Sequence, residues 1–391
     1  MRLAVYLDIP YRRDADGYST DKSVVRFVLA LRHHFEELSL LGRVDPFPGR
    51  FPYALSDDVG FVPLPWYESV WSLPAVTRAL PGTLVSARRA FADVDCAWIL
   101  GPGPVSVPLV PVAVAGRKRV VLGVRQDYRA YVRHRLPGSR RHPAVPASYA
   151  LEGAFRTFAR RLPVVVVGAD LARRYARGSP LFELAVSLVP GELIEEPAGE
   201  RFLIEPRRPV ELLSVGRLDR EKSPELLLEM LDLLETADER RWRLTIVGDG
   251  PLDEALRAEA GRFGPSVRFL GHVPNGPDLF RLYRESDVFV HVARTEGLPQ
   301  VLLEAQSFAL PVVGTDVGGI RDALGNGSRG MLVPPGRPRD LASAVSELAA
   351  DEGLRARLAR AGLEHARSLS LERQTARLAS FLKGPGGGAA G

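Results

Sequence analysis

The chain has 391 residues, of which 46% are hydrophobic and 25% are charged. These proportions are typical of a soluble globular protein and exclude a disordered or fibrous chain. The length predicts two domains, each large enough for its own hydrophobic core. The formal charge of +5 favours anionic partners such as nucleotides or acidic lipids. Acidic and basic residues are interspersed, which argues against a nucleic-acid partner, and the pairs Arg160–Arg161 and Arg173–Arg174 are expected on solvated helix faces.

A single cysteine, Cys96, excludes an intrachain disulfide and a multi-cysteine zinc site. It lies beside apolar residues and is expected to be a buried thiol. The start of the chain lacks the long apolar core of a signal peptide. The longest uncharged run, residues 96–116, contains four prolines, which argue against a helix and favour a strand, a loop and the start of a packed segment. We therefore expect a cytoplasmic protein, with contact at the inner face of the membrane left open.

Short apolar runs recur along the N-terminal half. A helix over residues 21–38 is expected after the first strand, and strands are expected near residues 3–7, 61–64, 97–100, 120–123 and 164–167. Four aromatic residues could stack on a sugar, although core packing is the favoured role for each of them: Trp66, Tyr67, Trp71 and Tyr128.

The C-terminal half alternates apolar runs with amphipathic stretches more clearly. Strands are expected at residues 210–216, 242–250, 267–271, 288–293 and 310–316. This alternation predicts a parallel sheet covered by helices. Most of the runs end in Gly, Asp or Thr, the loop residues expected at the carboxyl ends of strands, where doubly wound sheets bind their ligands. The ligand site is therefore expected at that edge.

A crossover rich in Pro, Glu and Gly occupies residues 186–209. It divides the chain into an N-terminal domain, residues 1–190, and a C-terminal domain, residues 205–370, and a closing helix over 371–382 can pack back on the first domain. The tail, residues 384–391, has the composition of a disordered segment. The expected fold is α/β, with two doubly wound, Rossmann-like domains facing one another across a cleft.

Two nucleotide-binding signatures are absent. No G-x-x-x-x-G-K-[ST] loop occurs, and the only G-x-G-x-x-G match is GGGAAG at the end of the chain, where no strand precedes it. An ATPase or a nicotinamide dehydrogenase is therefore disfavoured.

Glu296 and Glu304 lie eight positions apart in the stretch EGLPQVLLE. Pro299 suits the first position of a helix, because its missing N–H would have no partner there. Glu296 is then expected in a loop and Glu304 on the helix. The amides of Gln300 and Val301 and the helix dipole can face an anion, while each carboxylate can accept hydrogen bonds from vicinal hydroxyls. Taken alone the pair favours two solvated glutamates, and only the flanking sequence favours a sugar diphosphate site.

A second cluster, SVGRLDREKSP, places Arg217 and Lys222 between a strand end and a helix start. The two cations can neutralise a diphosphate. The alternative is a surface ion-pair cluster with Asp219 and Glu221, and it stays open.

Glycines mark two further strand ends, IVGDGP and VRFLGHV. At Gly248, a small residue lets a nucleotide lie close to the backbone, although a simple turn is the structural alternative. The loop of Gly271, His272 and Val273 can bond a base through main-chain groups. His272 itself is expected to be an ordinary loop histidine.

The chain contains five stretches in this order: SVGRLDREKSPELLLE, IVGDGP, VRFLGHV, ESDVFVHVARTEGLPQVLLEAQSFALPVVGTDVGG and GMLVPPG. In order and spacing they resemble the donor domain of the retaining glycosyltransferases of family 4, which have the two-domain GT-B fold. The close resemblance covers residues 210–336, and it is weak elsewhere. It implies that the first domain binds the acceptor and the second binds a nucleotide-sugar donor.

The resemblance also implies roles for single residues. Glu296 would meet the hydroxyls of the donor sugar, Glu304 the ribose, and Arg217 with Lys222 the diphosphate. Main-chain groups would contact the sugar and the phosphates from Gly297, Leu298, Pro299, Gln300 and Val301. Gly248 and the loop of Gly271, His272 and Val273 would border the nucleotide.

The first domain departs from the family pattern. Many members carry a glycine pair after the first strand, whereas this chain has only Gly17 in a longer loop. Many members place a histidine near the reacting centre, whereas this chain has Arg125, Gln126 and Asp127 after its VVLGV run. Asp127 is the candidate for that polar role, and capping the following helix is the alternative.

The implied reaction is transfer of a sugar, of hexosyl type, from a UDP- or GDP-type donor to an acceptor hydroxyl with retention. The acceptor is expected to be a small molecule, a glycan or a lipid-linked sugar. Neither Asp14-x-Asp16 nor Asp93-x-Asp95 follows a donor-domain strand, so no metal cofactor is expected. The alternatives are a nucleotide-sugar epimerase, a glycosyl phosphorylase, or a catalytically silent sugar-nucleotide binding protein.

Overall fold

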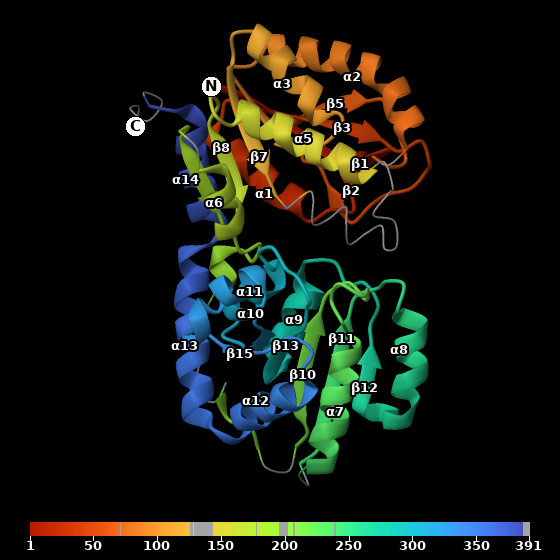
Figure 1. The fold of residues 1–391 in the computed structure, drawn as a ribbon, viewed down its shortest axis with the longest axis vertical. Coiled ribbons are helices and arrows are strands. Elements are labelled where there is room, and N and C mark those ends of the chain that lie inside the picture. Colours follow the sequence, from red (N-terminus) through yellow and green to blue (C-terminus); the bar gives the residue numbers. More distant parts are fainter. Residues whose placement is uncertain are drawn as a thin grey trace. The chain divides into compact units, whose positions relative to one another are not determined.

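The computed structural model describes residues 1–70, 72–125, 128, 144–176, 178–194, 202–205, 208–237 and 240–385. The chain divides into two compact units. Unit 1 consists of Met1–Leu184 and Glu372–Gly391, and unit 2 of Ala185–Leu371. Each unit contains a sheet with helices on its faces, as Figure 1 shows.

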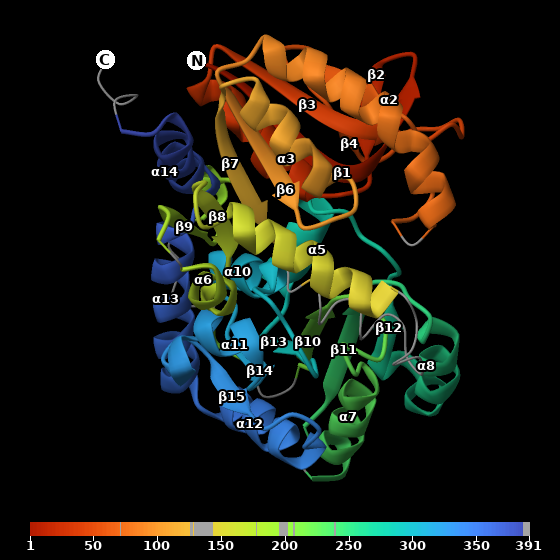
Figure 2. The same ribbon diagram turned by 45° about the horizontal axis from the view of Figure 1, so that its top comes forward.

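The sheet of unit 1 is largely parallel (Figure 2). Its parallel strands run in the order β5-β3-β1-β6-β7-β8-β9, with bounds β5 (Gly60–Leu64), β3 (Glu37–Val44), β1 (Arg2–Asp14), β6 (Cys96–Gly101), β7 (Arg119–Val124), β8 (Val164–Val167) and β9 (Leu181–Leu184). The end of β1 also pairs in antiparallel fashion with β2 (Gly17–Thr20), which in turn pairs with β4 (Tyr53–Ala54).

Helices of unit 1 share a buried apolar cluster with the strands. The cluster takes side chains from α2 (Leu73–Ala92), α3 (Ser106–Ala115), α5 (Ala144–Phe158) and α6 (Ala169–Tyr175), so these helices cover the same face of the sheet. A shorter helix, α1 (Val24–Ala30), follows β2, and a 3₁₀ turn, Leu31–His34, follows it.

The closing helix α14 (Leu371–Lys383) packs on unit 1. Its last carbonyls would lack partners within the helix. Arg119 donates from Nε to the Leu382 carbonyl at 2.7 Å and from a terminal nitrogen to the Phe381 carbonyl at 3.0 Å. Cys96 is fully buried and its Sγ lies 3.6 Å from the Leu382 carbonyl oxygen. Burial raises the pKa of the Cys96 thiol to about 12, which confirms a structural thiol.

Unit 2 has an entirely parallel sheet in its described residues, in the order β12-β11-β10-β13-β14-β15. The strands are β10 (Val210–Val215), β11 (Trp242–Val247), β12 (Val267–Phe269), β13 (Val288–His291), β14 (Val312–Thr315) and β15 (Met331–Val333). The helices are α7 (Glu225–Ala237), α8 (Asp253–Ala260), α9 (Pro277–Glu285), α10 (Gln300–Ser307), α11 (Gly318–Ala323), α12 (Pro338–Ala350) and α13 (Glu352–Ser368).

Strand order reverses once in each sheet. In unit 1 the chain first moves outward from β1 to β3 and β5, then returns to β6 on the other side of β1. In unit 2 it moves from β10 to β11 and β12, then returns to β13. Ligands of doubly wound sheets bind beyond the carboxyl ends of the strands at such a reversal. The candidate edges are therefore between β1 and β6 and between β10 and β13.

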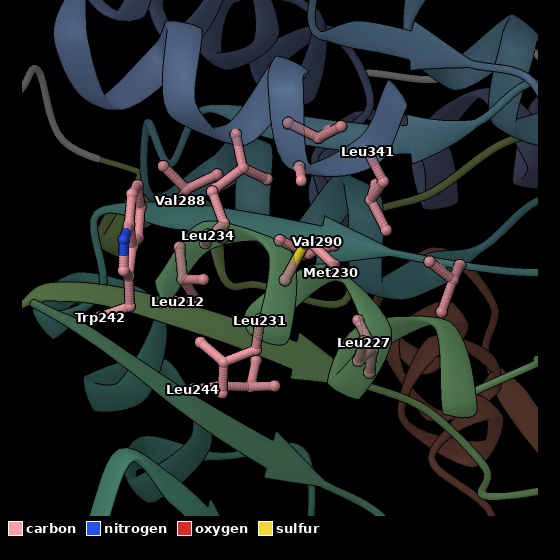
Figure 3. Close-up of a cluster of buried hydrophobic side chains, with 14 of the residues drawn as sticks. Leu212, Leu227, Met230, Leu231, Leu234, Trp242, Leu244, Val288, Val290 and Leu341 are labelled. Carbon is pink, nitrogen blue, oxygen red and sulfur yellow. The ribbon is translucent and has the colours of Figure 1, made fainter. Parts of the chain in front are cut away.

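Helix α7 shows how the sequence builds the core of unit 2 (Figure 3). Leu227, Leu231 and Leu234 recur at helical spacing and are at most 2% exposed. They belong to one apolar cluster with Leu212 on β10 and Val290 on β13. Burying each such side chain contributes about 2 kcal/mol, so the helix fixes the strands whose ends carry the site.

Several sequence expectations need correction. The helix expected over residues 21–38 ends at Ala30, and β3 begins at Glu37, because Leu38 and Leu40 alternate with Ser39 and pair beside β1. The proline-rich run 96–116 does contain a helix, α3. Pro108 lies in its first turn, where a missing N–H costs nothing, whereas Pro111 lies inside the helix, which forms despite it. No helix of the described residues is long and apolar enough to cross a membrane.

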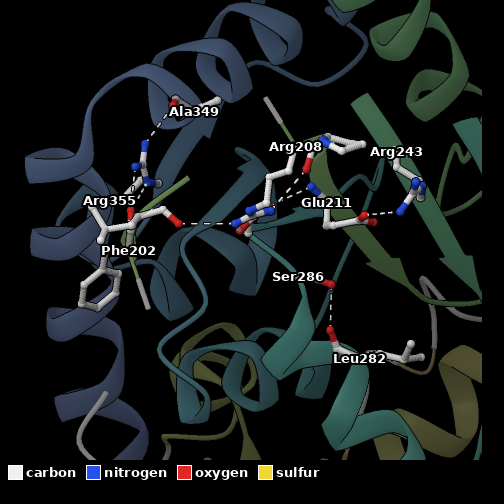
Figure 4. A network of polar contacts seen from close by, with 11 residues as sticks. Phe202, Arg208, Glu211, Arg243, Leu282, Ser286, Ala349 and Arg355 are labelled. Carbon is white, nitrogen blue, oxygen red and sulfur yellow. Dashed lines mark hydrogen bonds and ion pairs between the residues drawn. The ribbon is translucent and has the colours of Figure 1, made fainter. Parts of the chain in front are cut away.

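A polar network supports the amino ends of β10 and β13 (Figure 4). Asp287 is 5% exposed and accepts two hydrogen bonds of 2.7 Å from the Arg208 guanidinium and one of 2.9 Å from the Glu211 amide. In the same figure, the buried Arg355 donates to the Phe202 carbonyl at 2.6 and 3.0 Å and to the last carbonyls of α12. Both arginines therefore tie residues that precede β10 to the body of unit 2.

We predict that Asp287→Ala lowers the free energy of unfolding by about 2–3 kcal/mol, because it leaves a guanidinium and a backbone amide without their acceptor. Arg243→Ala is the matched control, since it breaks the more exposed Arg243–Glu211 pair and should cost less than about 1 kcal/mol. Urea unfolding of both variants measures the difference. Equal losses would contradict the special role of Asp287.

Candidate functional site

A small hollow opens at the strand reversal of unit 2. It has an empty volume of about 280 Å³ and lies between the carboxyl ends of β10 and β13. Its lining includes Gly216, Arg217 and Lys222 after β10, and His291 and Val292 at the end of β13. The expected edge of the sheet therefore carries two of the predicted polar side chains, those of Arg217 and Lys222.

Glu296 is the centre of this group. Its Oε2 forms an ion pair with Lys222 Nζ and lies 3.3 Å from His291 Nε2. Its Oε1 accepts a 3.2 Å hydrogen bond from the Gly297 amide. The Glu296 side chain is 13% exposed and that of His291 is 4% exposed. Because a carboxylate has no proton to give, His291 must donate from Nε2.

The electrostatic balance keeps Glu296 ionised. Burial alone raises the pKa of this carboxyl, but the hydrogen bond from His291 and the charge of Lys222 outweigh burial and lower the pKa to about 2. Glu296 is therefore a carboxylate throughout the neutral range and can only accept hydrogen bonds. That is the chemistry needed to hold hydroxyl groups of a ligand.

Two glycines position the Glu296 loop. A Cβ on Gly318 would lie 2.1 Å from the Glu296 carbonyl oxygen, and one on Gly319 would lie 1.5 Å from the Gly297 carbonyl oxygen. The Gly319 amide donates to the Glu296 carbonyl at 3.2 Å, and Gly318 has a φ of +45°. The start of α11 therefore lies directly against residues 296–297, and only glycine permits that approach.

The loop after β10 is fastened to the loop after β13. The Arg294 amide donates to the Glu221 carbonyl at 2.8 Å, and Arg294 Nε donates to Ser223 Oγ at 2.7 Å. Arg294 also forms a 3.5 Å ion pair with Glu225 at the start of α7. These contacts bring Lys222 to Glu296.

Glu304 lies on α10 and is 4% exposed. Its Oε1 accepts a 2.8 Å bond from Asn275 Nδ2, and its Oε2 accepts a 2.9 Å bond from the Tyr283 hydroxyl. The Tyr283 pKa is raised well above its ordinary value by burial and by the adjacent Glu304 charge. Glu304 is thus a fixed acceptor and not one of two solvated glutamates.

Arg217 is 55% exposed and pairs with Asp219 at 2.5 Å and with Glu221 at 3.1 Å. The contacts of Arg217 are therefore those of the surface ion-pair alternative. Lys222, at 14% exposure, points instead to Glu296. The two cations of this loop consequently occupy different environments.

The glycines at the strand ends hold adjacent loops together. A Cβ on Gly248 would lie 1.8 Å from the Gly216 carbonyl oxygen, and Gly248 donates its amide to the Gly271 carbonyl at 2.7 Å. A Cβ on Gly250 would lie 2.4 Å from the Leu218 carbonyl oxygen. The loops after β10, β11 and β12 therefore form one continuous backbone surface.

The remaining predicted residues are less central. Pro299 caps α10, one position before the helix, which begins at Gln300. His272 is exposed and Val273 packs on the apolar core. Gly17 lies in unit 1, where it begins β2, which forms a hairpin with β1. The long loop expected after the first strand is therefore shorter, because β1 continues to Asp14. Asp127 lies outside the described residues.

His291, Asn275 and Tyr283 were missed by the sequence analysis. His291 stands in the apolar run VFVHVA, and a lone polar residue at the carboxyl end of a buried strand is the signal that could have revealed it. Tyr283 and Asn275 belong to elements before β13 and meet Glu304 only through the fold. No spacing rule connects them.

A second hollow lies at the strand reversal of unit 1, with an empty volume of about 1360 Å³ that includes open solvent. Its polar lining includes Asp8, Lys22 and Arg43. Asp8 accepts a 2.6 Å bond from the Tyr67 hydroxyl and lies 3.4 Å from Arg43 Nε. Burial raises the Asp8 pKa, although Arg43 opposes the shift. Tyr67 is 3% exposed and belongs to the apolar core of unit 1, which confirms the core role expected for it.

Within the described residues, no three His, Cys, Asp or Glu side chains are grouped to hold a metal ion. Asp14 and Asp16 lie at the hairpin turn between β1 and β2. Their carboxylates are 3.7 and 2.5 Å from the Arg50 guanidinium. Asp95 instead accepts a 2.7 Å bond from the Arg2 amide. These carboxylates have structural contacts.

We predict that Gly319→Ala lowers the free energy of unfolding by about 2 kcal/mol or more, because its Cβ would overlap the Gly297 carbonyl oxygen. Gly261→Ala is the matched control, since a Cβ there meets nothing within 4 Å and should change stability by about 0.5 kcal/mol or less. Thermal unfolding measures both variants. Equal melting temperatures would show that the two loops are not held as described.

Known protein families match the second unit. Residues 200–365, which lie within unit 2, match the family model of the glycosyl transferases group 1. The chain is 32% identical over 220 residues to D-inositol 3-phosphate glycosyltransferase from Rhodococcus jostii, covering 54% of this chain and 45% of that protein. It is 36% identical over 163 residues to the sulfoquinovosyl transferase SQD2 from Arabidopsis thaliana, covering 41% of this chain and 30% of that protein. The chain thus spans less than half of the length of these relatives.

Solved structures match the whole chain in fold. Sucrose-phosphate synthase from Thermosynechococcus elongatus has a TM-score of 0.73 at 16% identity, with 98% of each chain covered. Anabaena HepE in complex with UDP and glucose has a TM-score of 0.69 at 15% identity, with 98% of this chain and 100% of that chain covered. The expectation of two parallel-sheet α/β domains of the GT-B type is confirmed.

Proposed function

We propose that the protein transfers a sugar from a nucleotide diphosphate sugar to an acceptor hydroxyl, with retention at the anomeric carbon and without a metal ion. The observation that carries the proposal is the Glu296 carboxylate, held ionised between Lys222 and His291 at the strand reversal of a group 1 glycosyl transferase domain. The two relatives reported above are named as a glycosyltransferase and a sulfoquinovosyl transferase.

The two glutamates suit two parts of a donor. Glu296 contacts Lys222 and His291, which line the hollow between β10 and β13, and it would accept hydrogen bonds from sugar hydroxyls. Glu304 lies on α10, where Asn275 and Tyr283 hold it, and it would accept bonds from the ribose hydroxyls. The Glu296–Lys222 pair and the Tyr283–Glu304 pair keep both carboxylates in place before the donor arrives, which lowers the ordering cost of binding.

Lys222 would stabilise the leaving diphosphate. As the bond between the sugar and the diphosphate breaks, negative charge grows on the diphosphate and positive charge on the sugar ring. Lys222 would supply compensating charge from one side, and the amides that begin α10 would supply donors from another. Arg217 would join them by exchanging Asp219 and Glu221 for phosphate oxygens, which its exposed position permits.

The acceptor would bind in the hollow of unit 1. That hollow offers carboxylate, ammonium and guanidinium groups from Asp8, Lys22 and Arg43. Such a lining suits a polar acceptor with hydroxyl groups. The raised pKa of Asp8 makes it a suitable partner for a hydroxyl that loses its proton during transfer.

We predict that Glu296→Ala and Lys222→Ala each reduce turnover by about 10²–10³-fold, because each removes a group that acts on charge developing in the transition state. The assay follows nucleotide diphosphate release with and without a panel of acceptors. UDP-glucose is the first donor to test, since HepE has been solved with it. Release that needs an acceptor supports transfer.

The exposed pair Arg257–Asp253 supplies the control, because Arg257→Ala changes one unit-2 surface cation far from the glutamates in sequence and should leave turnover unchanged. Donor isomerisation without release would favour an epimerase instead. Donor binding with no turnover would favour a silent binding protein. Full turnover in either site variant would contradict the assignment of Glu296 and Lys222.

We predict that His291→Leu raises the pH at which donor binding is lost. In the wild type, Glu296 has a folded pKa of about 2, below the ordinary value of 4.5, so its ionised form and the stability that it adds are complete above 4.5 and are lost as the pH falls towards 2. Removing the hydrogen bond from His291 raises that pKa. Donor affinity measured across the acid range by calorimetry should therefore fall at a higher pH.

His291→Gln is the matched control for this prediction, because its amide can still donate to the Glu296 carboxylate. It should shift the acid limb less than His291→Leu does. Superimposed pH profiles for the leucine variant and the wild type would show that His291 does not act on Glu296.

A further inference from the structure

Charge is divided unevenly between the two units. Unit 1 contains 29 Lys and Arg residues against 17 Asp and Glu residues, a net charge of +12. Unit 2 contains 23 against 30, a net charge of −7. The small formal charge of the whole chain therefore hides a strongly basic unit joined to an acidic one.

The excess is concentrated on one helical layer of unit 1. The three segments 73–92, 106–118 and 144–161 include α2, α3 and α5, which cover the same face of the sheet (Figure 2). The three segments contain a single acidic residue, Glu152, which is 1% exposed. Their cations, which we call the basic face, are Arg78, Arg88, Arg89, Arg117, Lys118, Arg156, Arg160 and Arg161.

None of these cations has an acidic partner among the residues that the structure describes. Elsewhere in unit 1 the pattern differs, since Arg12, Arg32 and Arg50 each pair with an aspartate. An array of like charges without counter-charges repels itself and costs stability. An anionic partner would remove that repulsion.

The helices that bear these cations also carry exposed apolar side chains. On α2 Leu73 is 52% exposed and Val85 is 51% exposed, on α3 Val114 is 47% exposed, and on α5 Tyr149 is 40% exposed. They are four of the five large exposed hydrophobic residues in the described part of unit 1. Side chains of this kind gain free energy by insertion below a layer of lipid head groups, and an aromatic phenol suits that interface.

A pocket on the same layer offers a place for one phosphate. It lies between α5 and α6, has an empty volume of about 520 Å³, and is lined by Arg156, Arg160 and Arg174 together with Thr157 and Tyr175. Arg174 lies 3.5 Å from the buried Glu152, which leaves Arg156 and Arg160 as the two cations of the basic face in this pocket.

We propose that the basic face docks unit 1 on an anionic lipid membrane, with a phosphate head group in the pocket between α5 and α6. The cations supply the long-range attraction, and the exposed apolar side chains supply the short-range insertion. A nucleic acid would satisfy the charges, but it would gain little from the four exposed hydrophobic residues. The membrane is therefore the partner that both features favour.

The test uses the full-length protein and sedimentation with vesicles of phosphatidylcholine, with and without phosphatidylglycerol. We expect binding only to the anionic vesicles, and weaker binding as NaCl is raised. Arg88→Gln with Arg89→Gln should weaken binding at least about tenfold, given the attraction that each cation near an anionic surface adds. Arg337→Gln with Arg339→Gln, exposed on unit 2, is the control and should bind as the wild type does.

Two further double variants test the short-range contributions to vesicle binding. Val85→Ser with Val114→Ser should weaken vesicle binding without changing net charge, and Arg156→Gln with Arg160→Gln should weaken it through the pocket. Circular dichroism verifies that each variant is folded. The proposal is overturned by failure of the wild type to bind anionic vesicles, by equal weakening in the unit 2 control, or by tighter binding to single-stranded RNA that the valine variants leave unchanged.

Discussion

The position of one buried carboxylate, that of Glu296, organises the functional edge of unit 2. Its side chain contacts Lys222 from the loop after β10 and His291 from the end of β13, and its carbonyl accepts the Gly319 amide after β14. Three separate loops are therefore fixed by one residue. The carboxylate can stay ionised at this depth only because both side-chain partners favour its charged form.

That arrangement depends on backbone contacts more than on side chains. Gly248 lies against Gly216, and Gly319 lies against Gly297, at distances that exclude a Cβ. A parallel sheet brings all its carboxyl ends to one edge, but it does not by itself bring the loops together. The glycines do so, and they explain why the tripeptide GDG directly follows β11 and the dipeptide GG begins three positions after the end of β14.

Much of unit 2 could be predicted because its signals are local. Its strands are continuous apolar runs, and α7 repeats leucine at helical spacing, so neither needs knowledge of the rest of the fold. Unit 1 was harder, since β3 follows a helix without a glycine or proline between them and α3 carries internal proline. The partners of Glu304 were not predictable at all, because Asn275 and Tyr283 approach it only after β12, α9 and α10 have packed.

The two units of the chain meet separate demands, and their difference in net charge follows from this. Unit 2 holds Glu296 and Glu304 in defined contacts, and Lys222 acts on Glu296 at short range although the net charge of the unit is negative. In the described part of unit 1, the cations of the basic face have no acidic partner. Because surface charge has little influence on the fold of a parallel sheet, these cations could accumulate on α2, α3 and α5 without disturbing the core beneath them. Their position on the outside of a helical layer, away from the strand ends that bear the hollow of unit 1, allows that layer to serve a surface while the strand ends serve the reaction.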